Sequence, residues 1–313
     1  MALFVIKPGM LTTVQDRGRW GFQSRGVPVA GPMDPFSHRL ANALVGNDPD
    51  AAGLEITLLG PELEFDDERV VAVAGAKFAL TVDGRPVASG SGAGAFLVGA
   101  GGRLRFGARA QGARAYLAVG GGIAVPPVLG SRSTHVISAM GGHEGRALRV
   151  GDRLPLGPAA STRRAARPPD LIVPLPAGHA RVRVLPGPQR ERFSNEALDV
   201  LQSSPYAIAQ NSDRMGFRLV GPPLAHAGGA DIVSDATPLG ALQVPASGQP
   251  ILLMADRQTT GGYPQIATAI TADLPLAAQL APGDQLTFAV CSAREALAAL
   301  IAQEQLLLRM APA

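Results

Sequence analysis

The chain has 313 residues, of which 46% are hydrophobic and 17% are charged, and its formal net charge is +3. This composition excludes a disordered chain and allows two domains of ordinary size. The basic residues are not interleaved with aromatic ones, as they are in a nucleic-acid binder. The chain has a single cysteine, Cys291, which excludes an internal disulfide. The five histidines do not have the spacing of metal ligands. Without a signal-peptide flank or an apolar run of about 18 residues, we expect a cytoplasmic protein with no membrane segment.

The N-terminal half is predicted to consist mostly of short strands, because glycine and proline are frequent and turns are closely spaced. A first strand is expected at residues 3–6. A short helix with Leu40 and Leu44 on its apolar face follows, capped by Asp34 or Ser37. Asp83-Gly84 is a hairpin signal. The remaining strands are predicted at residues 54–58, 63–65, 70–74, 78–82, 95–98, 104–106 and 115–119.

A proline-rich stretch separates two halves that resemble each other weakly. Residues 181–188 are similar to the opening residues 4–9, and two further pairs of similar segments follow in the same order in both halves. We therefore predict an N-terminal β-barrel half at residues 1–157, a linker at 158–170 and a C-terminal β-barrel half at 171–313. A helix is expected at 191–201, and a last helix begins with a capping box formed by Ser292 and Glu295.

Polar groups are concentrated in residues 256–264, directly after an apolar run at 250–255 that is typical of a buried strand. One interpretation is a ligand-binding loop, and the other is a hairpin loop whose polar groups satisfy its own backbone. Hydroxyl groups around an arginine in residues 130–134 are suited to an anion such as carboxylate or phosphate. Residues 15–19 and 211–216 are further polar clusters, in which neighbouring Asp and Arg side chains usually form structural ion pairs.

Taken together and in order, these clusters resemble the allophanate-hydrolase-subunit-2 family, also called the biotin-dependent carboxyltransferase family. The matching segments read GMLTTVQDRG at 9–18, GVPVAGPMD at 26–34, GSRST at 130–134, SDRMGFR at 212–218 and ADRQTTGGYP at 255–264. Shorter matches lie between them, so the resemblance extends from about residue 3 to residue 300.

The resemblance implies a mainly β fold of two cyclophilin-like β-barrel domains with a few short helices. It also implies two partners: an allophanate-hydrolase-subunit-1-like protein, called component B, and a lactam-hydrolase protein, called component A. The leading expectation is the C subunit of an ATP-dependent 5-oxoprolinase, which opens 5-oxoproline to L-glutamate. One alternative is the carboxyltransferase component of a biotin-dependent urea carboxylase or allophanate system. The other is a non-catalytic regulator that binds a kinase-inhibitor-like partner.

Under this resemblance, ATP is needed at the level of the complex. Biotin would arrive only on a separate carrier, and only in the carboxyltransferase case, because neither Lys7 nor Lys77 has a biotinyl-lysine setting. The residues expected to act on the substrate are Asp256, Arg257, Gln258 and Tyr263, with Asp256 holding Arg257 or acting as a base. The residues expected to bind the substrate are Asp16, Ser131, Arg132, Ser133, Arg214, Thr259 and Thr260.

Overall fold

The computed structural model describes residues 1–87, 92–158 and 175–310, which form two compact units. The first comprises Met1–Arg19, Ala30–Leu175 and Glu304–Ala313, and the second comprises Trp20–Val29 and Pro176–Gln303. The predicted linker at 158–170 lies outside the described residues except for Pro158. The units also differ from the predicted halves, because a short N-terminal segment belongs to the second unit and the C-terminal residues belong to the first.

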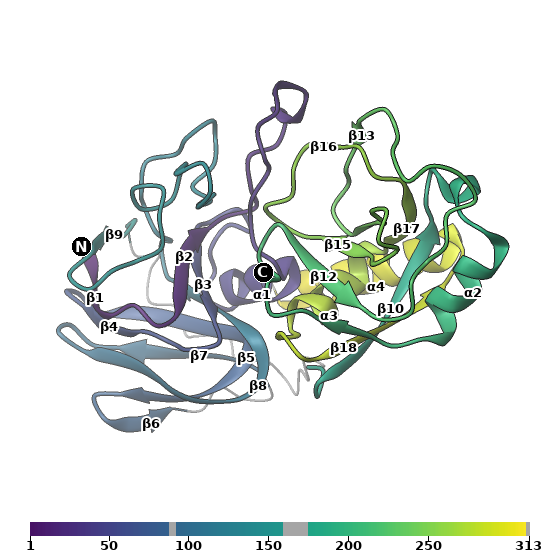
Figure 1. Ribbon diagram of the computed structural model, residues 1–313. Helices are drawn as coiled ribbons and strands as arrows, with labels where there is room; N and C mark the ends of the chain where they lie inside the picture. Colours follow the sequence, from purple (N-terminus) through teal and green to yellow (C-terminus); the bar gives the residue numbers. More distant parts are fainter. Residues whose placement is uncertain (88–91, 159–174, 311–313) are drawn as a thin grey trace. The chain divides into compact units, whose positions relative to one another are not determined.

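The first unit is built on a nine-stranded sheet (Figure 1). Its main path runs in the order β2-β3-β8-β4-β1-β9, and β5 joins it through β8 while pairing with β6 and β7. All of these pairings are antiparallel. The strands are β1 Ala2–Lys7, β2 Leu11–Gln15, β3 Gly53–Thr57, β4 Glu62–Phe65, β5 Arg69–Val82, β6 Arg85–Val87, β7 Ala93–Val98, β8 Arg103–Val119 and β9 Arg153–Pro155.

Two pairs of predicted short strands are single long strands in the structure. β5 covers both predicted strands between residues 70 and 82, and β8 covers those between 104 and 119. Register shifts between Gly75 and Leu80 bend the β5–β8 ladder without ending it, as β-bulges do. The predicted hairpin turn is confirmed: Asp83 and Gly84 both have positive φ, 50° and 76°, between Val82 and Arg85.

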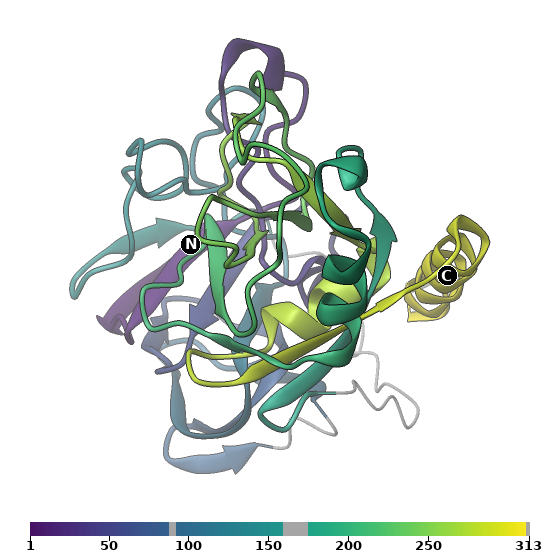
Figure 2. The ribbon, with the colours of Figure 1, turned by 45° about the vertical axis from the view of Figure 1, so that its right-hand side comes forward.

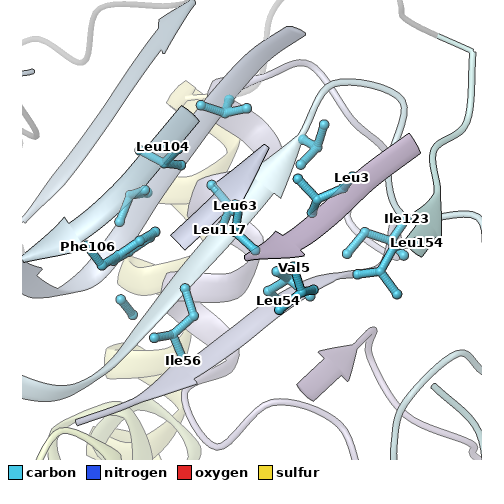
Figure 3. Packing of buried hydrophobic residues seen from close by; sticks show 14 of the residues in the cluster. Leu3, Val5, Leu54, Ile56, Leu63, Leu104, Phe106, Leu117, Ile123 and Leu154 are labelled. Atoms are coloured by element: carbon cyan, nitrogen blue, oxygen red, sulfur yellow. The ribbon is translucent and has the colours of Figure 1, made fainter. Parts of the chain in front are cut away.

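Alternating side chains of β5 and β8 fill two separate apolar layers, as the two-residue period of a strand requires. Val71 and Leu117 belong to the core enclosed by the curled sheet. Figure 3 shows Leu117 among the other side chains of this core. Ala72 and Tyr116 point to the opposite face, where helix α1 (Pro35–Leu44) covers them. Because both faces of these strands are covered, their central sequences are almost continuously buried.

Helix α1 begins at Pro35 and is capped by Asp34, whose carboxylate accepts from the backbone N–H and hydroxyl of Ser37 at 2.9 and 2.6 Å. Its apolar face shares a core with Leu307 and Met310 from the last turns of α4 (Ala293–Met310), the yellow helix in Figure 2. This packing explains why the C-terminal residues belong to the first unit. The capping box predicted for α4 is confirmed, since Ser292 and Glu295 bond each other reciprocally.

The second unit is a closed barrel with the strand order β10-β17-β14-β15-β12-β11-β18. It closes through parallel pairing of its first and last strands, β10 and β18 (Figure 1). The prediction of a mainly β chain is therefore confirmed. The strands are β10 His179–Pro186, β11 Tyr206–Ile208, β12 Gly216–Val220, β14 Ala241–Gln243, β15 Ile251–Leu253, β17 Gln265–Ala269 and β18 Gln285–Val290, and a separate ribbon pairs β13 Asp235–Ala236 with β16 Thr260–Gly261.

Short helices complete the second unit. Helix α2 begins later than predicted, at Asn195, because the Ser194 hydroxyl accepts from the backbone N–H of Ala197 at 3.2 Å and caps it there. Within the described residues, no helix is long and apolar enough to cross a membrane. The helices are α2 Asn195–Ser203, α3 Leu274–Ala278 and the 3-10 turns η1 Gln23–Arg25, η2 Arg190–Arg192 and η3 Thr271–Asp273.

The loop before β9 is held by Asp152. Its carboxylate accepts from both terminal nitrogens of Arg146, at 2.7 and 2.9 Å, and from the Arg149 backbone N–H at 2.7 Å. The Arg146 guanidinium holds the pKa of Asp152 at about 2. A carboxyl with a depressed pKa stabilises the fold above its ordinary pKa of 3.8, and this contribution disappears as pH falls toward 2.

We expect Asp152→Asn to lower the free energy of unfolding at pH 7 by about 1–2 kcal/mol. The difference from wild type should shrink between pH 4 and pH 2, because protonated Asp152 also loses its bonds to Arg146. Urea unfolding followed by circular dichroism at several pH values measures both effects. Glu68→Gln, at an exposed position of the same unit, is the control. An undiminished difference at pH 2 would contradict the expectation.

Candidate functional site

The polar loop after β15 is anchored to the segment before β12. The Met254 N–H bonds the Met215 carbonyl, and the Asp256 N–H bonds the Arg214 carbonyl, at 2.9 and 2.8 Å. The second of these bonds brings the side chains of Arg214 and Asp256 next to each other. Both carboxylate oxygens of Asp256 accept from Arg214, at 2.9 Å from Nε and 3.0 Å from Nη2, and both residues are buried. The prediction that Asp256 holds Arg257 is therefore wrong.

Arg257 is buried, with 8% of its surface exposed, and its charge is not neutralised within the described part of the protein. Its Nε donates to the Thr237 carbonyl at 2.8 Å, and Nη1 lies 3.5 Å from the Met254 carbonyl. Among the described residues, no carboxylate forms an ion pair with it. Burial lowers the pKa of the guanidinium to about 10, which still leaves it charged at neutral pH. An uncompensated charge in a sheltered position is typical of functional sites.

Side-chain amides and hydroxyls hold the loop around Arg257. The Gln258 side chain donates to the buried Gln243 at 3.1 Å, and the Gln258 carbonyl accepts from the Thr237 hydroxyl. The Thr259 carbonyl accepts from the Thr237 N–H at 3.1 Å, next to the β13–β16 ribbon. Thr237 and Gln243, which lie outside residues 256–264, therefore hold the loop, while Arg257 keeps donors that no described residue uses.

A cavity of about 480 Å³ opens beside Arg257 within the second unit. This volume is in the range of small-molecule sites. Its lining contains no carboxylate, imidazole or thiol, so it is equipped to bind and orient a ligand and lacks a side chain suited to act as general base at neutral pH. The lining residues are Trp20, Gln23, Val29, Ala236, Thr237, Pro238, Leu239, Arg257, Gln258 and Thr259.

In the first unit, Asp16 organises a second polar cluster. It accepts from the hydroxyls of Ser131 and Ser133 at 2.5 and 2.7 Å, and from the backbone N–H groups of Arg132 and Gly18 at 2.5 and 2.9 Å. Burial raises the pKa of Asp16, but these bonds together outweigh it and leave the pKa lowered. The Ser131 and Ser133 hydroxyls that were predicted to bind an external anion thus donate to a carboxylate of the chain itself, whereas the Arg132 side chain donates through Nε to the Val125 carbonyl at 2.8 Å.

Comparison with known proteins identifies the family. The model of the carboxyltransferase domain, subdomains A and B, matches residues 25–290. The chain belongs to this family. It is 42% identical to the 5-oxoprolinase C subunit of Escherichia coli (strain K12) over 297 residues, which cover 95% of this chain and 94% of that protein.

The fold is shared with a larger enzyme of the same family. The crystal structure of Kluyveromyces lactis urea carboxylase superposes with a TM-score of 0.93 and 33% identity, covering 99% of this chain and 29% of that one. Urea amidolyase of Lachancea kluyveri is 35% identical, with 92% of this chain and 17% of that protein covered. The chain thus corresponds to one domain of these long proteins, but to nearly the whole length of the bacterial protein.

The structure separates the predicted site residues of this carboxyltransferase-family chain into different environments. Arg257, Gln258 and Thr259 line the cavity, whereas Asp256 and Arg214 form a buried pair and Thr260 and Tyr263 lie outside the lining. The predicted residues Asp16, Ser131, Arg132 and Ser133 belong to the first unit. Among the described residues, no group of His, Cys, Asp or Glu side chains is assembled to hold a metal ion.

Sequence reasoning missed the contribution of Trp20 and Gln23 to the cavity. They lie more than 200 residues before Arg257, and no local pattern links the two segments. The sequence did contain a feature that could have pointed to Trp20. It is the single tryptophan of the chain, and it lies between Gly18 and Gly21 in a segment with little apolar periodicity. The residue is 60% exposed, so its indole is accessible to a ligand at the edge of the cavity.

Proposed function

We propose that this chain is the C subunit of an ATP-dependent 5-oxoprolinase. The observation that carries the proposal is the 42% identity, over almost the full length of both chains, to the Escherichia coli protein of that name. A second relative, the 5-oxoprolinase C subunit of Haemophilus influenzae, is 36% identical over 91% of this chain. The long urea enzymes share the domain, but at lower identity and as a small part of their length.

The proposed reaction opens a lactam. Water adds to the ring carbonyl of 5-oxoproline, the ring C–N bond breaks, and the nitrogen becomes the amino group of L-glutamate. ATP is hydrolysed to ADP and phosphate by the complex. The chain contains no phosphate-binding Gly-Lys-Ser/Thr loop, so we assign ATP binding to the assembly with its two partners, the allophanate-hydrolase-subunit-1-like component B and the lactam-hydrolase component A.

The residues that line the cavity support a role of this chain in substrate binding and a role of its partners in hydrolysis. A pocket with a fixed cation, amides and hydroxyls can hold a substrate, but the hydrolysis also needs proton transfer, for which the lining has no suitable group. The partner proteins would supply it. The regulator alternative has no specific support here.

The second candidate is the carboxyltransferase component of a biotin-dependent urea system. Its support is the TM-score of 0.93 with Kluyveromyces lactis urea carboxylase. In that case a separate carrier would bring carboxybiotin, and urea would be the acceptor. Urea is neutral, so it would leave the charge of Arg257 uncompensated, which is why we favour the oxoprolinase.

Reconstitution tests the proposal. The purified chain is combined with the co-expressed components A and B, and 5-oxoproline-dependent release of ADP and glutamate is measured. We expect turnover with all three proteins and none when any one is omitted. A complete mixture without 5-oxoproline-dependent turnover would overturn the proposal, and turnover of urea with a biotin carrier and carboxylase would establish the second candidate.

A further inference from the structure

The charge of the second unit's cavity points to the kind of ligand that fits it. Of the ten lining residues, only Arg257 is charged, and it is buried. A buried ion without a counter-charge is unfavourable, and a ligand that brings an anion removes this cost. The cavity should therefore prefer a monoanion over a neutral molecule of the same shape.

The hydrogen bonds of Arg257 leave one side of its guanidinium available. The Thr237 carbonyl fixes Nε, and the Met254 carbonyl lies beside Nη1. The described residues provide no acceptor for Nη2. A guanidinium held along one edge and open on another is oriented for a planar, two-oxygen acceptor such as a carboxylate.

The other walls of the cavity fit a compact, flat body. Trp20, Val29, Pro238 and Leu239 supply apolar surface, and Trp20 adds an aromatic face. Gln258 lies next to Arg257 and supplies an amide, so a ligand could combine a carboxylate, an apolar ring face and an amide. Urea has neither the charge nor the apolar face.

We propose that this cavity is the recognition pocket for a small cyclic amide that carries a carboxylate, with Arg257 binding the carboxylate and Trp20 covering the ring. The assignment of the ligand as 5-oxoproline rests on the proposed function. In this arrangement Trp20 is a specificity-determining residue, contributed by an N-terminal segment that belongs to the second unit.

The single tryptophan makes the pocket directly observable, because the intrinsic tryptophan fluorescence of the purified chain comes from Trp20. We expect a saturable fluorescence change with 5-oxoproline. 2-Pyrrolidinone, which has the same ring without the carboxylate, should bind more than tenfold more weakly, and urea should give no change. Calorimetric titration of the assembled complex with the same three compounds repeats the comparison without relying on fluorescence.

Two variants test the assigned contacts. Arg257→Gln should weaken 5-oxoproline binding on the order of 100-fold, whereas Arg218→Gln, at an exposed strand position of the same unit, should bind as wild type does. Trp20→Ala, read by calorimetry, should weaken binding about tenfold, and Val233→Ala at a 93% exposed position should not. Because Trp20 is exposed, its replacement tests the pocket even if Arg257→Gln fails to fold.

The outcomes separate this proposal from the proposed function. Equal binding of 5-oxoproline and 2-pyrrolidinone, or wild-type binding by both pocket variants, overturns the pocket assignment. If the variants also keep the wild-type KM in the complete complex, the oxoprolinase function stands and its substrate site lies elsewhere. Carboxylate-dependent binding in a complex that never turns over 5-oxoproline establishes the pocket and overturns the function.

Discussion

Replacing Asp256 by asparagine should lower the free energy of unfolding by about 3–5 kcal/mol, because it breaks a buried ion pair with two hydrogen bonds to Arg214. The pair is held by two bonds of 2.9 and 3.0 Å, and the two side chains are 3% and 7% exposed. The same pair ties the loop that carries Arg257 to the segment before β12. We therefore expect Asp256→Asn to weaken ligand binding in the cavity as well as stability.

Chemical unfolding followed by circular dichroism measures the effect on stability. Asp231→Asn, an exposed aspartate of the same unit, is the matched control and should change stability by less than about 0.5 kcal/mol. The double variant Arg214→Met with Asp256→Leu should lose less stability than Asp256→Asn, since it replaces both members of the buried ion pair by apolar side chains. If Asp256→Asn costs no more than the control, the buried pair contributes nothing to stability and this interpretation is wrong.

Replacing Asp16 by asparagine should destabilise the first unit by about 3 kcal/mol or more. The Asp16 carboxylate accepts four hydrogen bonds. In asparagine an N–H₂ group replaces one of the two carboxylate oxygens, so the hydroxyl and N–H groups that donated to that oxygen lose their acceptor. Each orphaned buried donor costs about 1–3 kcal/mol. The exposed control Glu68→Gln should be neutral, and a loss as small as that of the control would contradict the structural role assigned to Asp16.

The contribution of Asp16 to the stability of the fold should change with pH in a defined direction. Its pKa is lowered in the folded chain, so its stabilising contribution is complete above the ordinary pKa of 3.8 and is lost as pH falls through the folded value. The wild-type chain should therefore approach the stability of Asp16→Asn only in strong acid. A constant difference between the two chains down to pH 2 would support a role of Asp16 that does not depend on its charge.

Local features of the fold could be predicted because their causes lie within a few residues. The Asp83-Gly84 turn needs only two positive φ values, and the cap of α4 needs only Ser292 and Glu295. The long strands β5 and β8 could not be predicted in full. Their bulges interrupt the alternating pattern, and only the pairing of the two strands with each other shows that each continues through its irregular segment.

The sequence by itself determined the mainly β character of this chain, its family and three residues of the cavity, Arg257, Gln258 and Thr259. The tertiary structure alone decided their roles. Asp256 pairs with Arg214, 42 residues away, and not with the adjacent Arg257, because the loop after β15 bonds the segment before β12. Trp20 joins the cavity through the folding of a distant segment. Local patterns act over a few residues, whereas burial and charge pairing depend on which segments the fold brings together.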